Sequence, residues 1–289
     1  MTDQQELAER FEEQRGHLRA VAYRMLGSLA EADDAVQEAW LRLSRAGADD
    51  VANLAGWLTT VTGRICLDML RSRTARREDP LDVHLPDPVI SYYDGTDPER
   101  EALTADAVGL ALLVVLETLT PAERLAFVLH DLFGVPFNEI GTIVGRTPEA
   151  ARMLASRARH RVRSGAVGPD ADLGRQREVV DAFLAAARAG DFAALLELLD
   201  PDVVLRADVG RAAAAGFAPL IRGAAEVAGR ALLFSQPGAV SQPVLVNGAA
   251  GLLARRNGRL AAVLGFTVTN GKIVEIEVLA DPARLARLR

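Results

Sequence analysis

The residues best suited to chemistry in this sequence are arginines that gather in two short segments. They are Arg71, Arg73, Arg76 and Arg77, followed much later by Arg152, Arg157, Arg159, Arg161 and Arg163. A guanidinium group binds phosphate oxygens and can hold guanine through paired hydrogen bonds. The formal net charge of −6 argues against binding nucleic acid by bulk attraction, so these contacts must be local. For either group alone, a solvated helix face is the alternative interpretation.

The second group belongs to a helix-turn-helix pattern in residues 136–163. Gly145 permits the positive-φ turn that ends a first short helix, and Thr147 with Pro148 suits the start of a second. The outer face of the second helix then resembles a recognition helix, although a charged helical hairpin is the alternative. The expected DNA contacts are Arg146, Thr147, Glu149, Arg152, Ser156, Arg157, Arg159 and His160. One such motif does not separate a repressor from other DNA-binding proteins.

Helical periodicity extends over residues 5–77 and 101–164, which predicts two all-α domains. Residues 78–100 contain four prolines and many acids, so they are predicted to form a linker. A second linker is expected at 165–174. Residues 175–289 alternate apolar and polar positions and contain Asn-Gly pairs at 257–258 and 270–271, which favour tight hairpins. They predict an α+β domain with an antiparallel sheet.

Composition excludes several classes of site. The single cysteine, Cys66, allows neither an intrachain disulfide nor a thiolate zinc site, and its apolar neighbours predict a buried structural thiol. No metal and no cofactor are expected. The sequence lacks the roughly 18 consecutive apolar residues of a membrane span. Its amino terminus is acidic and polar, so we expect a soluble cytoplasmic protein with no membrane partner.

Two segments at the amino-terminal end, residues 22–43 and 53–77, resemble the sigma-2 domain of extracytoplasmic-function (ECF) RNA polymerase sigma factors. Residues 116–163 resemble their sigma-4 domain. The resemblance implies a protein that binds the β′ and β subunits of core RNA polymerase and directs it to the −10 and −35 elements of a promoter. It assigns polymerase binding to Asp33, Asp34, Gln37, Glu38, Trp40 and Leu41. It assigns −10 DNA binding to Asn53, Arg64, Arg71, Arg73, Arg76 and Arg77, and −35 DNA binding to the helix-turn-helix residues.

Residues 179–208 resemble the start of SnoaL-like domains, which are curved sheets wrapped by helices around a pocket. One ECF group, the sigma-J-like factors, carries such a domain at its carboxy terminus. The group has a Trp-Leu-Pro-Glu-Pro signature in the linker, a glycine-rich stretch after an aspartate, and a terminal Asn-Pro-Asp-Lys-Leu. The linker signature corresponds here to His84, Leu85, Pro86, Asp87 and Pro88, with histidine in place of tryptophan. The glycine-rich stretch is reduced to Asp208, Val209, Gly210 and Arg211, and the terminal motif is matched by Asp281, Pro282, Ala283, Arg284 and Leu285.

The resemblance implies that these three stretches form a regulatory interface, so that the fused domain replaces a separate anti-sigma protein. The expected domains are then sigma-2 at 5–77, a linker at 78–100, sigma-4 at 101–164, and a SnoaL-like regulatory domain at 175–289.

Catalysis by the last domain is not expected. SnoaL-like enzymes need acid and base groups, and residues 175–289 contain no His, Tyr, Cys or Trp. We therefore expect no catalytic residues, although an unknown small ligand remains possible for this domain. Two other functions stay open: a ligand-sensing helix-turn-helix regulator that acts without polymerase, and a cyclase or isomerase with fused helices.

Overall fold

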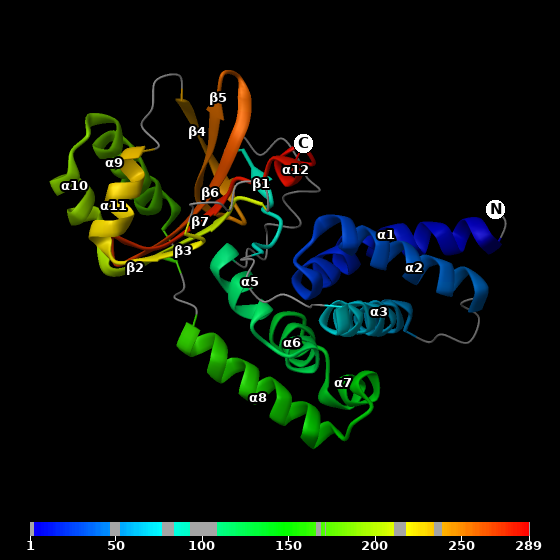
Figure 1. Ribbon diagram of the computed structural model, residues 1–289. Helices are drawn as coiled ribbons and strands as arrows, with labels where there is room; N and C mark the ends of the chain where they lie inside the picture. The colour runs from blue at the N-terminus through cyan, green and yellow to red at the C-terminus, as the bar shows by residue number, and fades with distance from the viewer. Residues whose placement is uncertain are drawn as a thin grey trace. The chain divides into compact units, whose positions relative to one another are not determined.

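The computed structural model describes residues 3–46, 53–76, 84–92, 109–165, 169–170, 172–210, 218–233 and 239–288 (Figure 1). The chain divides into two compact units. The first contains Met1–Glu78 and Val115–Gly165, and the second contains Asp79–Val114 and Ala166–Arg289. The proline-rich stretch that follows the first helices therefore belongs to the same unit as the carboxy-terminal sheet.

Three long helices, α1 (Asp3–Leu26), α2 (Leu29–Ala46) and α3 (Leu54–Arg76), pack together in the first unit. Apolar residues at helical spacing, such as Leu18, Met25 and Leu67, are fully buried between them. Gly27 separates α1 from α2 with φ of 71°, a conformation that glycine adopts without steric strain. The structure confirms that Cys66 is buried, and this burial raises the pKa of its thiol to about 12.

The rest of the first unit consists of α6 (Pro121–Phe127), the short π-helical segment η1 (Val128–Leu132), α7 (Phe137–Val144) and α8 (Pro148–Gly165). Thr120 and Glu123 cap α6 reciprocally. Gly145 ends α7 with φ of 69°, as the sequence predicted. A Cβ atom on Gly141 would lie 2.7 Å from the carbonyl oxygen of Arg146, so the turn between α7 and α8 requires glycine there.

The second unit is built on a seven-stranded sheet in the order β1-β4-β5-β6-β7-β2-β3. Its strands are β1 (Ile90–Ser91), β2 (Leu199–Asp208), β3 (Leu220–Arg222), β4 (Ala239–Val246), β5 (Ala249–Arg256), β6 (Arg259–Thr269) and β7 (Lys272–Leu279). Its helices are α9 (Leu173–Ala189), α10 (Phe192–Leu198), α11 (Ala224–Leu233) and α12 (Pro282–Leu285). The helix α5 (Leu110–Glu117) runs from this unit into the first.

The sheet is antiparallel, as expected, with one exception. Strands β2 and β7 pair in parallel, because β2 enters the sheet after the helices α9 and α10 rather than through a hairpin. Tight turns join β4 through β7, and each contains an Asn-Gly pair with positive φ, at Asn247, Asn257 and Asn270.

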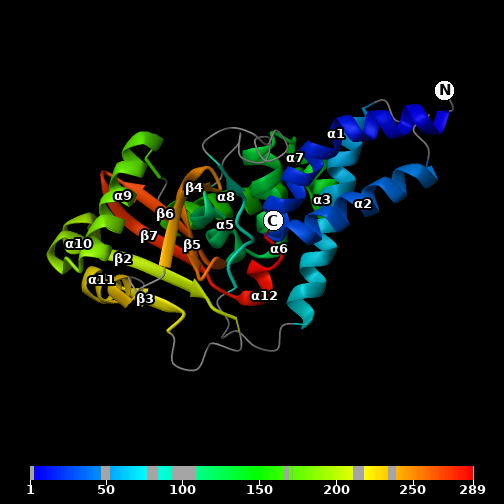
Figure 2. The ribbon, with the colours of Figure 1, turned by 90° about the horizontal axis from the view of Figure 1, so that it is seen from above.

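Helices α9, α10 and α11 cover one face of this sheet (Figures 1 and 2). Phe183 of α9 meets Phe266 of β6 with ring centroids 5.8 Å apart, and Leu195 and Val227 are fully buried beside them. Apolar residues of the three helices and of the sheet thus form one buried cluster between them.

The opposite face of the sheet carries a group of buried charges. Leu205, Ala207, Ile276 and Val278 point toward the helices, and alternation along the strands therefore places Arg206, Glu275 and Glu277 on the other side. The Arg206 guanidinium lies 3.1 Å from Glu275 and 3.6 Å from Glu277. Burial, together with the neighbouring Glu275 carboxylate, raises the pKa of Glu277 to about 8. At neutral pH, Glu277 thus keeps its proton beside the contact between Arg206 and Glu275.

This raised pKa predicts a pH-dependent stability. Between its ordinary pKa of 4.5 and about 8, folded Glu277 holds a proton that the unfolded chain has lost. The free energy of unfolding should therefore fall as pH rises through this range, by up to about 1.4 kcal/mol per pH unit. Glu277→Gln should flatten this slope in denaturant titrations at pH 5 to 8, whereas Glu226→Gln, at an exposed site on α11, should keep it. A slope that Glu277→Gln leaves unchanged contradicts the assignment.

Candidate nucleic-acid interface

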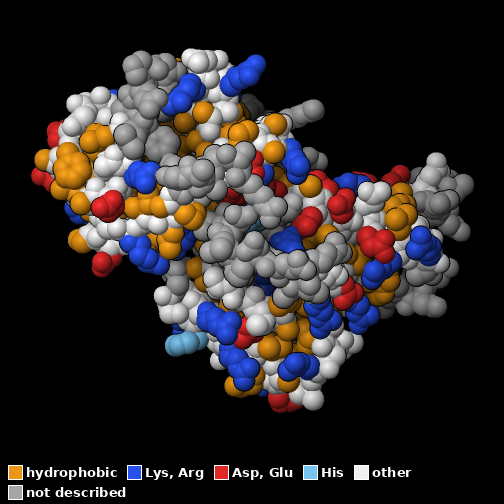
Figure 3. All heavy atoms as spheres, in the orientation of Figure 1, with side chains coloured by type: hydrophobic (Ala, Val, Ile, Leu, Met, Phe, Trp, Pro, Cys, Tyr) orange, Lys and Arg blue, Asp and Glu red, His pale blue; other side chains and the backbone are white. Residues whose placement is uncertain are grey.

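The helix-turn-helix presents most of the expected DNA-binding residues on one surface. Ala151, Leu154 and Ala158 of α8 are buried against the unit, so the opposite side of the helix faces solvent. Arginine side chains gather over α8 in the lower part of Figure 3. The exposed members of the expected set are Arg146, Thr147, Glu149, Arg152, Ser156, Arg157 and His160. The Thr147 hydroxyl accepts a hydrogen bond from the Ala150 N–H at 3.3 Å and so caps the helix.

Arg152 is held in place by an aromatic side chain of the preceding helix. Its guanidinium lies over the Phe137 ring, 5.4 Å from the centroid. His130 stacks on the same ring at 3.8 Å, and its Nδ1 lies 3.1 Å from the Val135 carbonyl oxygen. Hydrogen bonds from its own backbone and from Thr147, followed by the charge of Arg152, lower the pKa of Glu149. Arg152 therefore projects from a preformed group of side chains rather than from a bare helix face.

Other arginines of α8 pair with carboxylates in the unit. Arg159, which was expected to contact DNA, forms an ion pair with Asp131 at 2.7 Å. Arg161 pairs with Glu123, the capping residue of α6, at 2.9 Å. These two residues therefore also fasten α8 to the segment that precedes α7.

The residues expected to bind polymerase lie along α2. Asp33, Asp34, Gln37 and Leu41 are exposed, whereas Glu38 and Trp40 are half-buried. The Trp40 ring packs on Phe11 of α1 with centroids 5.1 Å apart, so part of its role is structural. Asp33 pairs with Arg19 at 2.6 Å, and Glu38 pairs with Arg42 at 2.9 Å. The surface of α2 thus combines acids with the exposed apolar side chain of Leu41.

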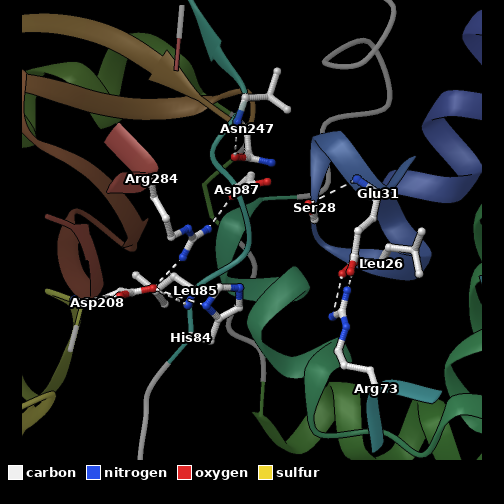
Figure 4. A network of polar contacts seen from close by, with 12 residues as sticks. Leu26, Ser28, Glu31, Arg73, His84, Leu85, Asp87, Asp208, Asn247 and Arg284 are labelled. Carbon is white, nitrogen blue, oxygen red and sulfur yellow. Dashed lines mark hydrogen bonds and ion pairs between the residues drawn. The ribbon is translucent and has the colours of Figure 1, made fainter. Parts of the chain in front are cut away.

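The residues expected to bind the −10 element differ in their exposure and in their structural roles. Asn53 caps α3, since its Oδ1 accepts the Gly56 N–H at 3.0 Å. Arg64 and Arg71 of α3 are exposed. Arg73 is half-buried: it pairs with Glu31 and donates a hydrogen bond to the Leu26 carbonyl oxygen at 3.1 Å (Figure 4). The side chain of Arg76 and the whole of Arg77 lie outside the described residues.

Three distant stretches of the second unit meet around one guanidinium group. Arg284 of α12 lies 2.5 Å from Asp208 at the end of β2 and 2.6 Å from Asp87 in the linker (Figure 4). The Asp208 carboxylate also accepts the Leu85 N–H at 3.3 Å and lies 3.7 Å from the His84 ring. Since Asp208 and Arg284 are largely buried, the network is shielded from water. The structure thus brings together residues that the sequence placed in a regulatory interface.

Buried residues of the linker and of α12 pack around the Arg284 network. Leu85, Pro86 and Pro88 are buried in the second unit, and so is Leu285 of α12. Gly210 has φ of 68°, and a Cβ atom there would lie 2.7 Å from the carboxyl carbon of Asp281. Asp281 itself caps α12, and Pro282 occupies its first turn. Arg211 lies outside the described residues.

One residue of this contact was missed from the sequence. Asn247 accepts the Val89 N–H at 3.1 Å through its side chain, and its own N–H donates to the Val89 carbonyl oxygen at 2.8 Å. Directly after Val89, β1 pairs with β4 and adds a strand to the edge of the sheet. The only sequence signal was the Asn-Gly pair at 247–248, which is also the signature of a hairpin turn.

Comparisons with known proteins agree with this architecture. A family profile described as Sigma-70 region 2 matches residues 11–76, and one described as Sigma-70, region 4 matches residues 109–162. The chain is 38% identical over 282 residues to the probable ECF RNA polymerase sigma factor SigI of Mycobacterium tuberculosis, which covers 95% of this chain and 93% of that protein. It is 41% identical over 287 residues to SigJ of the same organism, with coverage of 94% and 91%.

A solved structure extends the agreement to three dimensions. The crystal structure of SigJ from Mycobacterium tuberculosis superposes with a TM-score of 0.77 at 36% identity, and the match covers 96% of this chain and 98% of that chain. The expected fold class, two helical regions followed by an α+β SnoaL-like domain, is confirmed. No helix among the described residues could cross a membrane. The chain belongs to the extracytoplasmic-function RNA polymerase sigma factors.

Proposed function

We propose that this sigma factor, which binds core RNA polymerase and directs it to promoter DNA, is regulated in cis by its carboxy-terminal unit. The observation that carries the proposal is the Arg284 guanidinium, which joins Asp87 of the linker to Asp208 of the sheet. The linker lies between the two regions that read the promoter, so its docking on the sheet limits the length of free chain between them. A contact tethered within one chain persists even when it is weak, because its effective concentration is high.

The interactions with polymerase and DNA are divided among three helices. The exposed acids of α2 and Leu41 suit a positively charged partner surface, for which we propose the β′ subunit, with β as a further contact. Asn53 with the arginines of α3 serves the −10 element. The polar face of α8 serves the −35 element, where Arg152 reads a base and Arg157 binds phosphate.

Within this proposal the carboxy-terminal unit is regulatory and not catalytic. The pKa-shifted Glu277 carboxyl is fully buried, and residues 175–289 provide no His, Tyr or Cys to work with it. Action on RNA polymerase places the protein in the cytoplasm, and no cofactor is required.

The relatives named as sigma factors do not favour a repressor that acts without polymerase. A gel shift on promoter DNA with and without core polymerase tests the choice: strong binding only with polymerase supports the sigma factor.

Removal of the Arg284 side chain should release the linker. Arg284→Ala leaves Asp208 and Asp87 without their shared cation, and loss of one partner from a buried pair is strongly destabilising. We expect hydrogen exchange at Leu85 and Val89 to accelerate at least about tenfold, with a changed yield of transcript in a reconstituted assay. The exposed Arg287→Ala is the control. Unchanged exchange and transcription in Arg284→Ala would count against regulation through this contact.

Arg152 should determine base preference within the −35 element. Arg152→Ala should reduce discrimination at one base pair by about 1–3 kcal/mol. Phe137→Leu should produce part of this loss, because the guanidinium loses its aromatic support, and Phe137→Tyr should restore it. Arg163→Ala, at the exposed end of α8, should leave the preference unchanged. Selection of bound promoters from a randomised −35 pool measures all four variants, and an unaltered preference in Arg152→Ala removes this residue from the base-reading set.

Charge reversal on α2 should weaken polymerase binding. Asp34→Lys places a cation among the exposed acids of α2, so the rate of association with core enzyme should fall and depend less on salt. Glu13→Lys, at an exposed position on α1, is the matched control. Surface plasmon resonance at two salt concentrations measures the rate at which each variant associates with core polymerase. Equal association rates for Asp34→Lys and Glu13→Lys would refute the assignment of α2 as the polymerase-binding surface.

A further inference from the structure

One large apolar side chain lies on the solvent-exposed side of α8. Met153 is 55% exposed, whereas Leu154, the next residue of the helix, is buried. Among the described residues of the first unit, Leu41 of α2 and Met153 are the exposed large apolar side chains. Isolated apolar residues are common on protein surfaces, so exposure alone shows nothing, and the position of Met153 on the helix decides what it can contact.

Met153 belongs to the stripe of α8 that points directly away from the unit. Successive residues of an α-helix are rotated by about 100°. The buried side of α8 is defined by Ala151, Leu154, Ala155 and Ala158. On this rotation, four exposed residues lie within about 30° of the line opposite the buried side, namely Glu149, Met153, Ser156 and His160. Met153 therefore lies where a recognition helix enters the groove most deeply.

Charged residues show which part of the DNA this stripe faces. Arg152 and Arg157 begin about 70° to either side of it, where their long side chains suit the two strands that border a groove. Glu149 lies in the stripe itself, and hydrogen bonds from its own backbone and from Thr147 lower its pKa. A charged carboxylate is repelled by phosphates but can accept a hydrogen bond from a base amino group. The stripe that contains Met153 therefore faces base edges.

The major groove offers one kind of apolar partner to such a side chain. Base edges present nitrogen and oxygen donors and acceptors there, and the apolar group that specifies a base is the 5-methyl group of thymine. A methionine side chain is unbranched, flexible and polarisable, so it can adjust its terminal atoms to a methyl group on a base edge. It has no hydrogen bond to offer that would distinguish the other three bases.

We propose that Met153 is a base-reading residue that recognises a thymine of the −35 element through its 5-methyl group. The inference rests on the function proposed above, but it assigns a different base from the one that Arg152 reads. Burial of one methyl group contributes about fourfold in affinity, equivalent to ~0.8 kcal/mol. Met153 thus adds a preference for one base without adding a charge contact.

Variants at this exposed position test the assignment without disturbing the core. Each variant is combined with core polymerase, and bound promoters are selected from a pool with a randomised −35 element. Met153→Ala should lose the preference for thymine at one position and keep the other preferences. Met153→Leu should retain it, because the side chain stays apolar, whereas Met153→Gln, of similar length but polar, should lose it. Equal selection of thymine by wild type and Met153→Ala overturns the proposal.

A change in the DNA isolates the methyl group itself. Deoxyuridine differs from thymidine only in lacking this group, so it is placed at each thymine of the selected −35 element in turn. At one position wild type should bind about fourfold more weakly, whereas Met153→Ala should bind both forms equally. Arg152→Ala should keep the difference, because another side chain produces it.

Three outcomes of the deoxyuridine experiment have distinct meanings. Equal binding of thymidine and deoxyuridine by wild type at every position overturns the proposal, and so does an undiminished difference in Met153→Ala. Weaker binding of Met153→Ala to all sequences alike, with the deoxyuridine effect intact, identifies a contact with polymerase and also overturns it. A wild-type chain that forms no promoter complex with core polymerase would instead refute the proposed function.

Discussion

The Arg284 guanidinium holds the linker against the carboxy-terminal sheet. Two carboxylates, Asp87 and Asp208, approach the same cation from segments that are far apart in the sequence. A buried charge is tolerated when it is paired, so each of these residues requires the other two. Around this network Leu85, Pro86 and Pro88 are buried, and β1 continues the sheet.

Buried arginines join distant segments in both units, but their partners differ. Arg284 meets carboxylates, which gives a strong contact with fixed geometry. Arg124 of α6 donates a hydrogen bond to the Arg24 carbonyl oxygen of α1, and the Arg24 guanidinium lies over the Phe133 ring.

The local features of the fold were predictable, because they depend on short patterns. Gly145 and Thr147 defined the helix-turn-helix, and the Asn-Gly pairs defined two hairpins. The stretches that were expected to form a regulatory interface were found by resemblance, and the structure places Asp87, Asp208 and Arg284 in contact. The pairing of Arg73 with Glu31, the burial of Arg124 and the proton held by Glu277 were not predictable, because each depends on contacts between elements distant in sequence. Such charges look like ordinary surface residues in the sequence.

The pairing of β1 with β4 also protects the sheet. An edge strand offers unpaired N–H and C=O groups that can recruit another chain, and β1 covers that edge at Leu245 and Val246. Farther along β4, Val240 remains 63% exposed. Displacement of the linker would lengthen this open, partly apolar margin. Under the regulation proposed above, release of the linker would therefore carry a second consequence, because the uncovered edge of β4 becomes a site at which another chain can pair.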